Sequence, residues 1–249
     1  MIATPRIVGS VEARMGSSRL PGKVLMDIAG QPLLLRLFNR LKACKLLDDV
    51  VLATTTSHAD DDLESFARQN DILFYRGSEN DVLDRVVKAH SMMSTDIIVE
   101  FTGDCPLTDP EIVDYAIDMF LHNHADVVSN VRIPSFPEGV DVQVFRADAL
   151  KHVAETVNDP AVREHVSLYF YENPQNYRVL NILAPNVWRL PGQRLQVDYE
   201  EDLQLARLIY SNLLPKHGEL FGLPQIISLL KQCPEMSAIN AGCKEKSVR

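Results

Sequence analysis

Cysteine is scarce in this chain, and the spacing of the few cysteines excludes several classes of protein. Four occur among 249 residues, at positions 44, 105, 233 and 243, and no two of them form a C-x-x-C pair. A zinc knuckle or a disulfide framework is therefore not expected. No apolar run reaches the roughly 18 residues that span a membrane, and the N-terminus lacks a signal peptide's apolar region. We expect a cytoplasmic protein without a membrane partner.

Basic tracts are absent as well. The chain has 25 Lys and Arg against 34 Asp and Glu, which gives a formal net charge of −9. Nucleic-acid binding needs a basic face that neutralises phosphates, so a nucleic-acid partner is not expected. Against this acidic background, any local group of cations suits a small anionic ligand better than a polymer.

Two familiar nucleotide-binding patterns are also missing. The dinucleotide fingerprint G-x-G-x-x-G does not occur. A Walker A loop has four residues between its glycines and a Ser or Thr after its lysine. Here five residues separate Gly16 from Gly22, and Val24 follows Lys23. The sequence therefore excludes both of these loops.

What the chain does contain is a cationic loop of small residues after an apolar N-terminal segment. The stretch VEARMGSSRLPGKVL runs from Val11 to Leu25 and carries Arg14, Arg19 and Lys23. Small residues let backbone N–H groups approach an anion closely, and cations add charge-assisted hydrogen bonds. The pattern predicts a polyphosphate site, and the alternative is a basic surface loop.

Strands and helices alternate along the chain, which favours an α/β fold with a mostly parallel sheet covered by helices. The composition fits one large domain or a domain with a small appendage. The predicted strands are Pro5–Val11, Val50–Thr54, Ile72–Tyr75, Asp96–Phe101, Ala125–Asn130, Val140–Phe145, Arg178–Leu183 and Arg194–Val197. The predicted helices are Gln31–Cys44, Ser57–Asn70, Asn80–Ser91, Asp109–Leu121, Ala147–Thr156, Val162–Tyr171, Glu200–Ser211 and Gly222–Gln232. Residues 1–232 form one domain in this interpretation, and 233–249 form a flexible tail.

Two aspartates follow predicted strands, where ligands of an open α/β sheet bind. Asp104 follows the strand that ends at Phe101, and Asp198 follows Val197. Mg²⁺ takes one or two carboxylates together with phosphate oxygens, so this pair predicts a magnesium site, although either residue is also a reasonable turn or N-cap residue. The acids at positions 60, 61 and 62 lie in a helix's first turn, which indicates a solvated face stabilised by the helix dipole.

The ordered motifs resemble those of the sugar-acid cytidylyltransferases, which activate 3-deoxy-manno-octulosonate and acylneuraminates with CTP. The similarity is greatest to the branch of the spore-coat polysaccharide synthesis protein F, and it covers roughly residues 5 to 212. The matching segments are Ala13–Lys23, Tyr75–Arg85, Thr102–Leu107, Phe136–Val142, Arg163–Val166 and Val197–Leu203.

The resemblance implies a three-layer α/β/α sandwich of the nucleotide-diphospho-sugar transferase type, with a small extension around 132–190 that mediates a homodimer. It also implies transfer of CMP from CTP to a sugar acid with release of pyrophosphate, Mg²⁺ as cofactor, and a role in surface polysaccharide synthesis. The implied site residues are Arg14, Lys23 and Asp104 for catalysis; Ala13, Arg14, Gly16, Ser17, Ser18, Arg19, Lys23, Arg76 and Thr102 for the nucleotide; Asp141, Arg163 and His165 for the acceptor; and Asp104 and Asp198 for the metal.

Two alternatives stay open at this point. One is a nucleotide-sugar-dependent glycosyltransferase of the same broad fold, although its usual Asp-x-Asp pair at a strand end is missing. The other is a non-catalytic, nucleotide-binding regulatory subunit. Cys105 after Asp104 departs from the Gly-Asp-Glu-Pro-Leu motif of the octulosonate enzymes. The sequence therefore leaves the acceptor and the strictness of the cytosine preference open.

Overall fold

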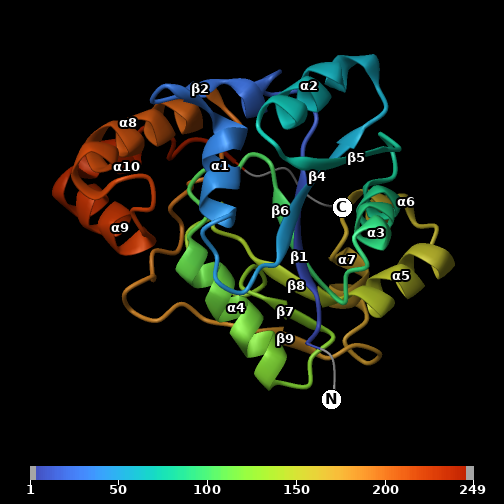
Figure 1. The fold of residues 1–249 in the computed structure, drawn as a ribbon. Coiled ribbons are helices and arrows are strands. Elements are labelled where there is room, and N and C mark those ends of the chain that lie inside the picture. Colours follow the sequence, from blue (N-terminus) through green and yellow to red (C-terminus); the bar gives the residue numbers. More distant parts are fainter. Residues whose placement is uncertain (1–3, 245–249) are drawn as a thin grey trace.

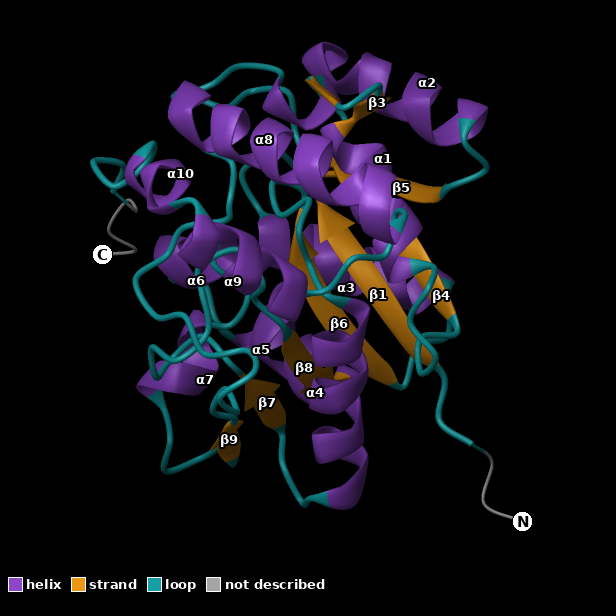
Figure 2. Cartoon of the chain, turned by 90° about the vertical axis from the view of Figure 1, so that its left-hand side faces the viewer, coloured by secondary structure: helices purple, strands orange, loops and turns teal. Residues whose placement is uncertain are grey.

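The computed structural model describes residues 4–244, which build a seven-stranded sheet with helices on both faces (Figure 1; Figure 2). Its strands are β1 (Ile7–Glu12), β4 (Asp49–Thr55), β5 (Leu73–Gly77), β6 (Ile97–Thr102), β7 (Val127–Ser129), β8 (Gln143–Arg146) and β9 (Val179–Asn181). A separate two-stranded ribbon pairs β2 (Asp27–Ile28) with β3 (Gln31–Pro32). Valine, isoleucine and leucine dominate the central strands because both faces of the sheet are covered.

The order of the strands places a topological reversal beside β1. The order is β5-β4-β1-β6-β8-β7-β9, and β8 is the strand that runs antiparallel to its neighbours. The chain adds strands on one side of β1 and then crosses to β6 on the other, and open α/β sheets bind ligands beyond the strand ends at such a reversal. Glu12 pairs with Thr102 at this edge. The segments that follow β1 and β6 therefore start side by side.

The helices form two layers over separate apolar cores, which confirms the predicted α/β sandwich (Figure 1). One layer holds α1 (Leu33–Leu41), α2 (Asp61–Gln69) and α4 (Pro110–His122), and it continues into α8 (Glu200–His217), α9 (Leu223–Gln232) and α10 (Pro234–Ala238). The other holds α3 (Val82–Met92), α5 (Ala147–Thr156), α6 (Pro160–Glu164) and α7 (Leu168–Glu172). Short 3-10 helices are η1 (Lys23–Leu25) and η2 (His58–Asp60). Within residues 4–244, every helix is too short or too polar to cross a membrane.

Two predicted elements differ from the structure. Residues 194–197 form no strand; instead, Arg194 makes an isolated bridge to Glu138. The apolar side chains of this segment, Leu195 and Val197, are buried, but its backbone does not join the hydrogen bonds of the sheet. Their burial gives the sequence the alternation of apolar and polar residues that is typical of a strand. The predicted helix 162–171 is interrupted at His165, whose extended backbone separates α6 from α7.

The predicted flexible tail also differs from the structure, at residues 233–244. This segment contains α10, and the side chains of Met236 and Asn240 are buried. Met236 packs in the main core, and Asn240 joins a hydrogen-bond network. Because most residues of this segment are small or polar, the sequence pattern does not indicate that Met236 and Asn240 are buried. Residues 245–249 lie outside the described residues.

A buried carboxyl group lies on β6 near the ligand-binding edge. Glu100 is 7 % exposed and accepts a hydrogen bond of 3.0 Å from the side-chain amide of Gln143. Burial, together with the nearby Asp141 carboxylate, raises the pKa of Glu100 from 4.5 to about 8. The folded protein therefore keeps a proton that the unfolded chain loses at lower pH.

This difference makes stability depend on pH. The contribution of Glu100 is fully present below pH 4.5 and is lost as the pH rises through about 8, because the unfolded chain ionises first. Glu100→Gln should remove a slope of up to about 1.4 kcal/mol per pH unit from the free energy of unfolding in this window. Urea denaturation at several pH values measures the slope, with exposed Glu79→Gln as the control. Parallel curves for wild type and Glu100→Gln would contradict the prediction.

Candidate active site

The centre of the site is one lysine held between two aspartates. The Lys23 ammonium lies 2.6 Å from Asp104 Oδ2 and 2.7 Å from Asp198 Oδ1. Lys23 and Asp198 are buried and Asp104 is half-buried. Burial alone would lower the pKa of Lys23, but the two carboxylates outweigh it and raise that pKa. A fixed positive charge therefore lies at the crevice beyond β1 and β6.

The loop before Lys23 folds back on itself. The carbonyl of Met15 accepts hydrogen bonds from the N–H groups of Ser17 and Gly22. Gly22 has a left-handed backbone (φ 72°), a conformation that favours glycine, and η1 starts directly after it. The exposed Arg14 side chain makes no hydrogen bond or ion pair with any residue between 4 and 244. The loop thus keeps Lys23 inside and leaves Arg14 open to an anion.

Asp60 fixes this loop, and this corrects its interpretation as a solvated helix-dipole residue. It is 2 % exposed, and its carboxylate accepts hydrogen bonds from the Met15 N–H at 2.7 Å and from the Thr55 hydroxyl. Asp61 and Asp62 are exposed, as predicted. The sequence pattern does not distinguish Asp60 from Asp61 and Asp62, because it does not show that Asp60 ends η2 and that α2 starts only at Asp61.

Asp104 follows β6 through a turn that only a glycine permits. A Cβ on Gly103 would lie 2.8 Å from the Cβ of Ala13 and 2.9 Å from the carbonyl oxygen of Glu12. Burial would raise the pKa of Asp104, but the charge and hydrogen bond of Lys23, with bonds from Thr102 and Gln196, lower it below its usual value. The carboxylate is therefore ionised and available to a cation.

Asp198 is held by an arginine network that the sequence analysis missed. Arg194 donates to Asp198 Oδ2 at 2.5 Å and from Nε to both oxygens of Asp202 at 3.1 Å. Asp202 also accepts the N–H groups of Asp198 and Tyr199. An acid at the third position of a helix often accepts the N–H of the N-cap residue, so the sequence pattern could have predicted the bond between Asp202 and the Tyr199 N–H. The role of Arg194 depends on tertiary contacts.

The second predicted cation of the loop also reaches Asp198. Arg19 lies 2.7 Å from Asp198 Oδ1 and 5.2 Å from the centre of the Tyr199 ring. The structure therefore brings together Arg19, Lys23, Asp104 and Asp198, whose positions span most of the chain. Gly16, Ser17 and Ser18 lie on the same loop, with Gly16 and Ser18 exposed.

The remaining predicted residues lie outside this cluster of four, and their roles stay predictions. Thr102 is exposed at the end of β6, and Asp141 lies between the two buried valines at 140 and 142. Arg76 forms ion pairs with acids of α2, and Arg163 pairs with Asp81 at 2.5 Å. His165 is half-buried between α6 and α7.

The two aspartates suit a divalent cation whose remaining coordination positions are filled by a bound ligand. Asp104 and Asp198 present carboxylate oxygens to one positive charge, and hard cations such as Mg²⁺ prefer such oxygens. Among residues 4–244, no group of three or more His, Cys, Asp or Glu side chains is placed to hold a metal ion. The residues therefore fit Mg²⁺ whose other ligands come from phosphate and water.

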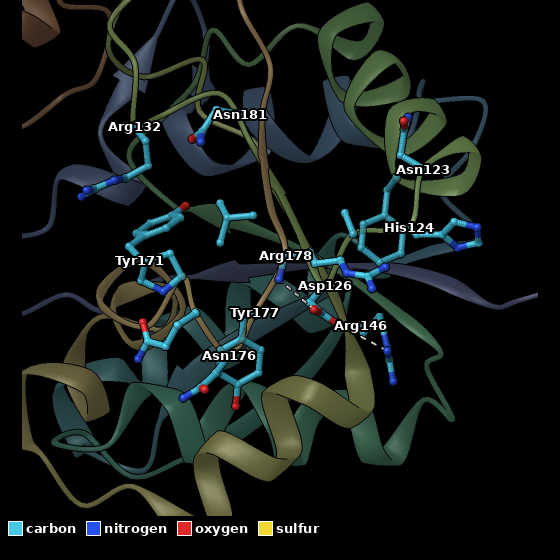
Figure 3. A pocket seen from close by; sticks show the side chains of 15 residues that line it. Asn123, His124, Asp126, Arg132, Arg146, Tyr171, Asn176, Tyr177, Arg178 and Asn181 are labelled. Carbon is cyan, nitrogen blue, oxygen red and sulfur yellow. Dashed lines mark hydrogen bonds and ion pairs between the residues drawn. The ribbon is translucent and has the colours of Figure 1, made fainter.

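A separate cavity of about 1190 Å³ lies along β9 (Figure 3). Its lining includes Tyr171, Tyr177 and Arg178, and Figure 3 shows the Arg146 side chain near Asp126 within it. The predicted site residues do not line this cavity. It is therefore distinct from the crevice that holds Lys23.

A family model described as Cytidylyltransferase matches residues 8–232. This match includes the whole loop, both aspartates and Arg194. The chain belongs to the cytidylyltransferase family. The match confirms the family that the sequence motifs predict.

Individual relatives agree with this assignment. "Spore coat polysaccharide biosynthesis protein SpsF" of Bacillus subtilis is 34% identical over 232 residues, covering 90% of this chain and 94% of that protein. "Uncharacterized protein MJ1063" of Methanocaldococcus jannaschii is 37% identical over 246 residues, covering 98% of each. A 3-deoxy-manno-octulosonate cytidylyltransferase of Chloroherpeton thalassium is 30% identical over 188 residues, covering 73% of this chain and 70% of that enzyme. This cytidylyltransferase thus lies in an SpsF-like branch.

Solved structures share the fold. A cytidylyltransferase from Leptospira borgpetersenii matches with a TM-score of 0.88 and 30% identity, covering 98% of this chain and all of that one (100%). A CMP-2-keto-3-deoxy-manno-octonic acid synthetase complexed with CTP matches with a TM-score of 0.62 over 83% of this chain and 99% of that one, at 18% identity. The latter likeness concerns the fold alone.

The anchoring role of Asp60 generates a prediction. Asp60→Ala leaves the Met15 N–H without its partner, so the loop should lose its fixed geometry. We expect the KM for CTP to rise roughly tenfold, in line with about 1–3 kcal/mol for one buried, charge-assisted hydrogen bond. Steady-state kinetics measures the change. The matched control is Asp62→Ala, because Asp62 is a nearby aspartate whose side chain is exposed. Equal effects of the two substitutions on the KM for CTP would contradict the anchoring role of Asp60.

Proposed function

We propose that this cytidylyltransferase transfers CMP from CTP to a sugar acid and releases pyrophosphate. The observation that carries the proposal is the pairing of Lys23 with Asp104 and Asp198 beside the exposed Arg14. This arrangement offers two carboxylates to a divalent cation. Together with Arg19, it offers three cations to a triphosphate. The solved relative complexed with CTP supports CTP as the substrate.

In this proposal the phosphate loop binds and neutralises the triphosphate. Arg14 and Arg19 contact the phosphates from the exposed side, and Lys23 contacts them from the buried side. Gly16, Ser17 and Ser18 supply backbone and hydroxyl contacts. Nucleotidyl transfer depends on positioning and charge neutralisation more than on covalent chemistry by the protein.

Asp104 and Asp198 would hold Mg²⁺. When bound, the ion neutralises phosphate oxygens and polarises the reacting phosphorus. The acceptor oxygen attacks the α-phosphorus, and the new P–O bond forms as the bond to the bridging oxygen of the β-phosphate breaks. Pyrophosphate leaves with that electron pair, and the proton of the acceptor hydroxyl passes to solvent water.

The sugar-acid acceptor and the polysaccharide role come from the relatives. One is named for spore coat polysaccharide biosynthesis and another for 3-deoxy-manno-octulosonate. We propose that Asp141, Arg163 and His165 face the acceptor, and that Arg76 and Thr102 line the nucleotide pocket. The cytoplasm is the compartment that we propose for the reaction.

We also propose a homodimer built through β9. Arg178 O and Ile182 N bond to β7, so the backbone groups of Val179 and Asn181 point away from β7, and both residues line the cavity of Figure 3. Ile133 and Leu183, on the loops beside β7 and β9, are 47% and 52% exposed. A free strand edge flanked by exposed apolar side chains is suited to pairing with a second copy.

The catalytic proposal predicts the effect of losing one carboxylate. Asp104→Asn should lower kcat about 100-fold or more while the protein stays folded, because it removes one of the two carboxylates that would hold the Mg²⁺ at the reacting phosphates. The measurement is pyrophosphate release from CTP with Mg²⁺ and either 3-deoxy-manno-octulosonate or an acylneuraminate. Asp118→Asn, on the exposed side of α4, is the control. Undiminished turnover by Asp104→Asn would exclude the assigned role.

The dimer proposal has its own test. Leu183→Asp should convert a particle of twice 28.0 kDa into one of 28.0 kDa in light scattering, since it places a charge in the interface. Leu220→Asp is the matched control, because Leu220 is also 52% exposed but follows α8. A monomeric wild type, or a dimer that survives Leu183→Asp, would contradict an interface at β9.

A further inference from the structure

The C-terminal segment after α9 returns to the active site. Residues 233–244 lie beyond the part of the chain that the family model matches, which ends at 232. They include α10, which packs beside α8 and α9 at one side of the molecule (Figure 1). Asn240 follows α10 and is 2% exposed. A buried amide in a short polar segment requires partners.

The partners of Asn240 belong to the network around Asp198. Its side-chain amide donates 2.7 Å to Asp202 Oδ1 and 3.0 Å to the carbonyl oxygen of Arg194. The side-chain amide of Gln193 donates to Asn240 Oδ1 at 3.5 Å. Asn240 therefore bridges the strand-like segment that carries Arg194 and the first turn of α8 that carries Asp202.

These contacts lead directly to the proposed metal ligand. Asp202 is completely buried and binds the Arg194 Nε, and Arg194 in turn binds Asp198 Oδ2. The other oxygen of Asp198 faces Lys23 and Arg19. Asp198 thus has one oxygen turned to the ligand crevice because the opposite oxygen is held by Arg194.

A second contact of the same segment reaches the other side of the site. The Tyr199 hydroxyl donates to the carbonyl oxygen of Lys244 at 3.3 Å, and Arg19 lies over the Tyr199 ring. The segment therefore touches residues adjacent to Asp198 at two separate points.

We infer that the C-terminal segment completes the active site, with Asn240 as a positioning residue that orients Asp198 through Asp202 and Arg194. This inference rests on the proposed function, since it takes Asp198 as a ligand of Mg²⁺. Partners that orient a metal ligand from behind commonly affect metal affinity by about 10–100-fold when they are removed. Asn240 should therefore control how well the site uses Mg²⁺, not how it contacts the nucleotide.

The test measures CTP binding without an acceptor, so that it does not depend on turnover. Titration calorimetry gives the Kd for CTP with and without Mg²⁺ for wild type and Asn240→Ala. We expect Asn240→Ala to weaken binding roughly tenfold with Mg²⁺ and to leave binding without Mg²⁺ unchanged. Ala241→Ser is the control, since Ala241 is exposed beside Asn240. Equal Kd values for wild type and Asn240→Ala, or equal loss with and without Mg²⁺, would overturn the inference.

A second variant separates positioning from packing. Asn240→Asp has the same size but replaces the N–H donor with an oxygen that faces the Asp202 carboxylate. It should reduce Mg²⁺-dependent binding at least as much as Asn240→Ala. Loss of the thermal unfolding transition in both variants would show a structural role and also overturn the inference. If wild type itself binds CTP no better with Mg²⁺, the proposed function fails, whereas a wild-type response in these variants refutes only the role of Asn240.

Discussion

The interaction on which the site depends is the sharing of one lysine ammonium by two aspartates. Lys23 follows β1, Asp104 follows β6, and Asp198 precedes α8, so this contact joins three distant parts of the chain. Two carboxylates that approach the same point would repel unless a positive charge lies between them. Without a ligand, Lys23 supplies that charge. A bound triphosphate would bring negative charge to Lys23, and its divalent cation would bring positive charge to the two aspartates.

Two supports behind this contact keep its geometry. On one side, Asp60 holds the cationic loop before Lys23 by the Met15 N–H. On the other side, Arg194 and Asp202 hold Asp198 from behind. Both supports use buried carboxylates that each accept at least two hydrogen bonds, and these bonds hold the side chains in one orientation. The chain thus holds the cluster of Lys23, Asp104 and Asp198 from two sides with buried polar anchors.

The sequence predicted those features that depend on local pattern. Apolar runs located the sheet, and the small and cationic residues of 13–23 located the phosphate loop. The end of a predicted parallel strand located Asp104, and Asp198 was found at the end of a predicted strand that the structure does not contain. Sequence reasoning missed the roles of Asp60, Arg194 and Asn240. Asp60 binds the N–H of Met15, 45 residues away, and Asn240 binds the carbonyl oxygen of Arg194, 46 residues away, so only the folded chain brings them together. It also mistook residues 194–197 for a strand, because burial produces the same apolar pattern.

The central claim is that this crevice binds the triphosphate of CTP with Mg²⁺. Thermal unfolding of the wild-type protein with each nucleoside triphosphate in the presence of Mg²⁺ tests this most directly. A ligand at 100 times its Kd stabilises the native state by about 2.7 kcal/mol. The account predicts a rise in melting temperature that is largest with CTP and depends on Mg²⁺. An unchanged melting temperature with every triphosphate would contradict it.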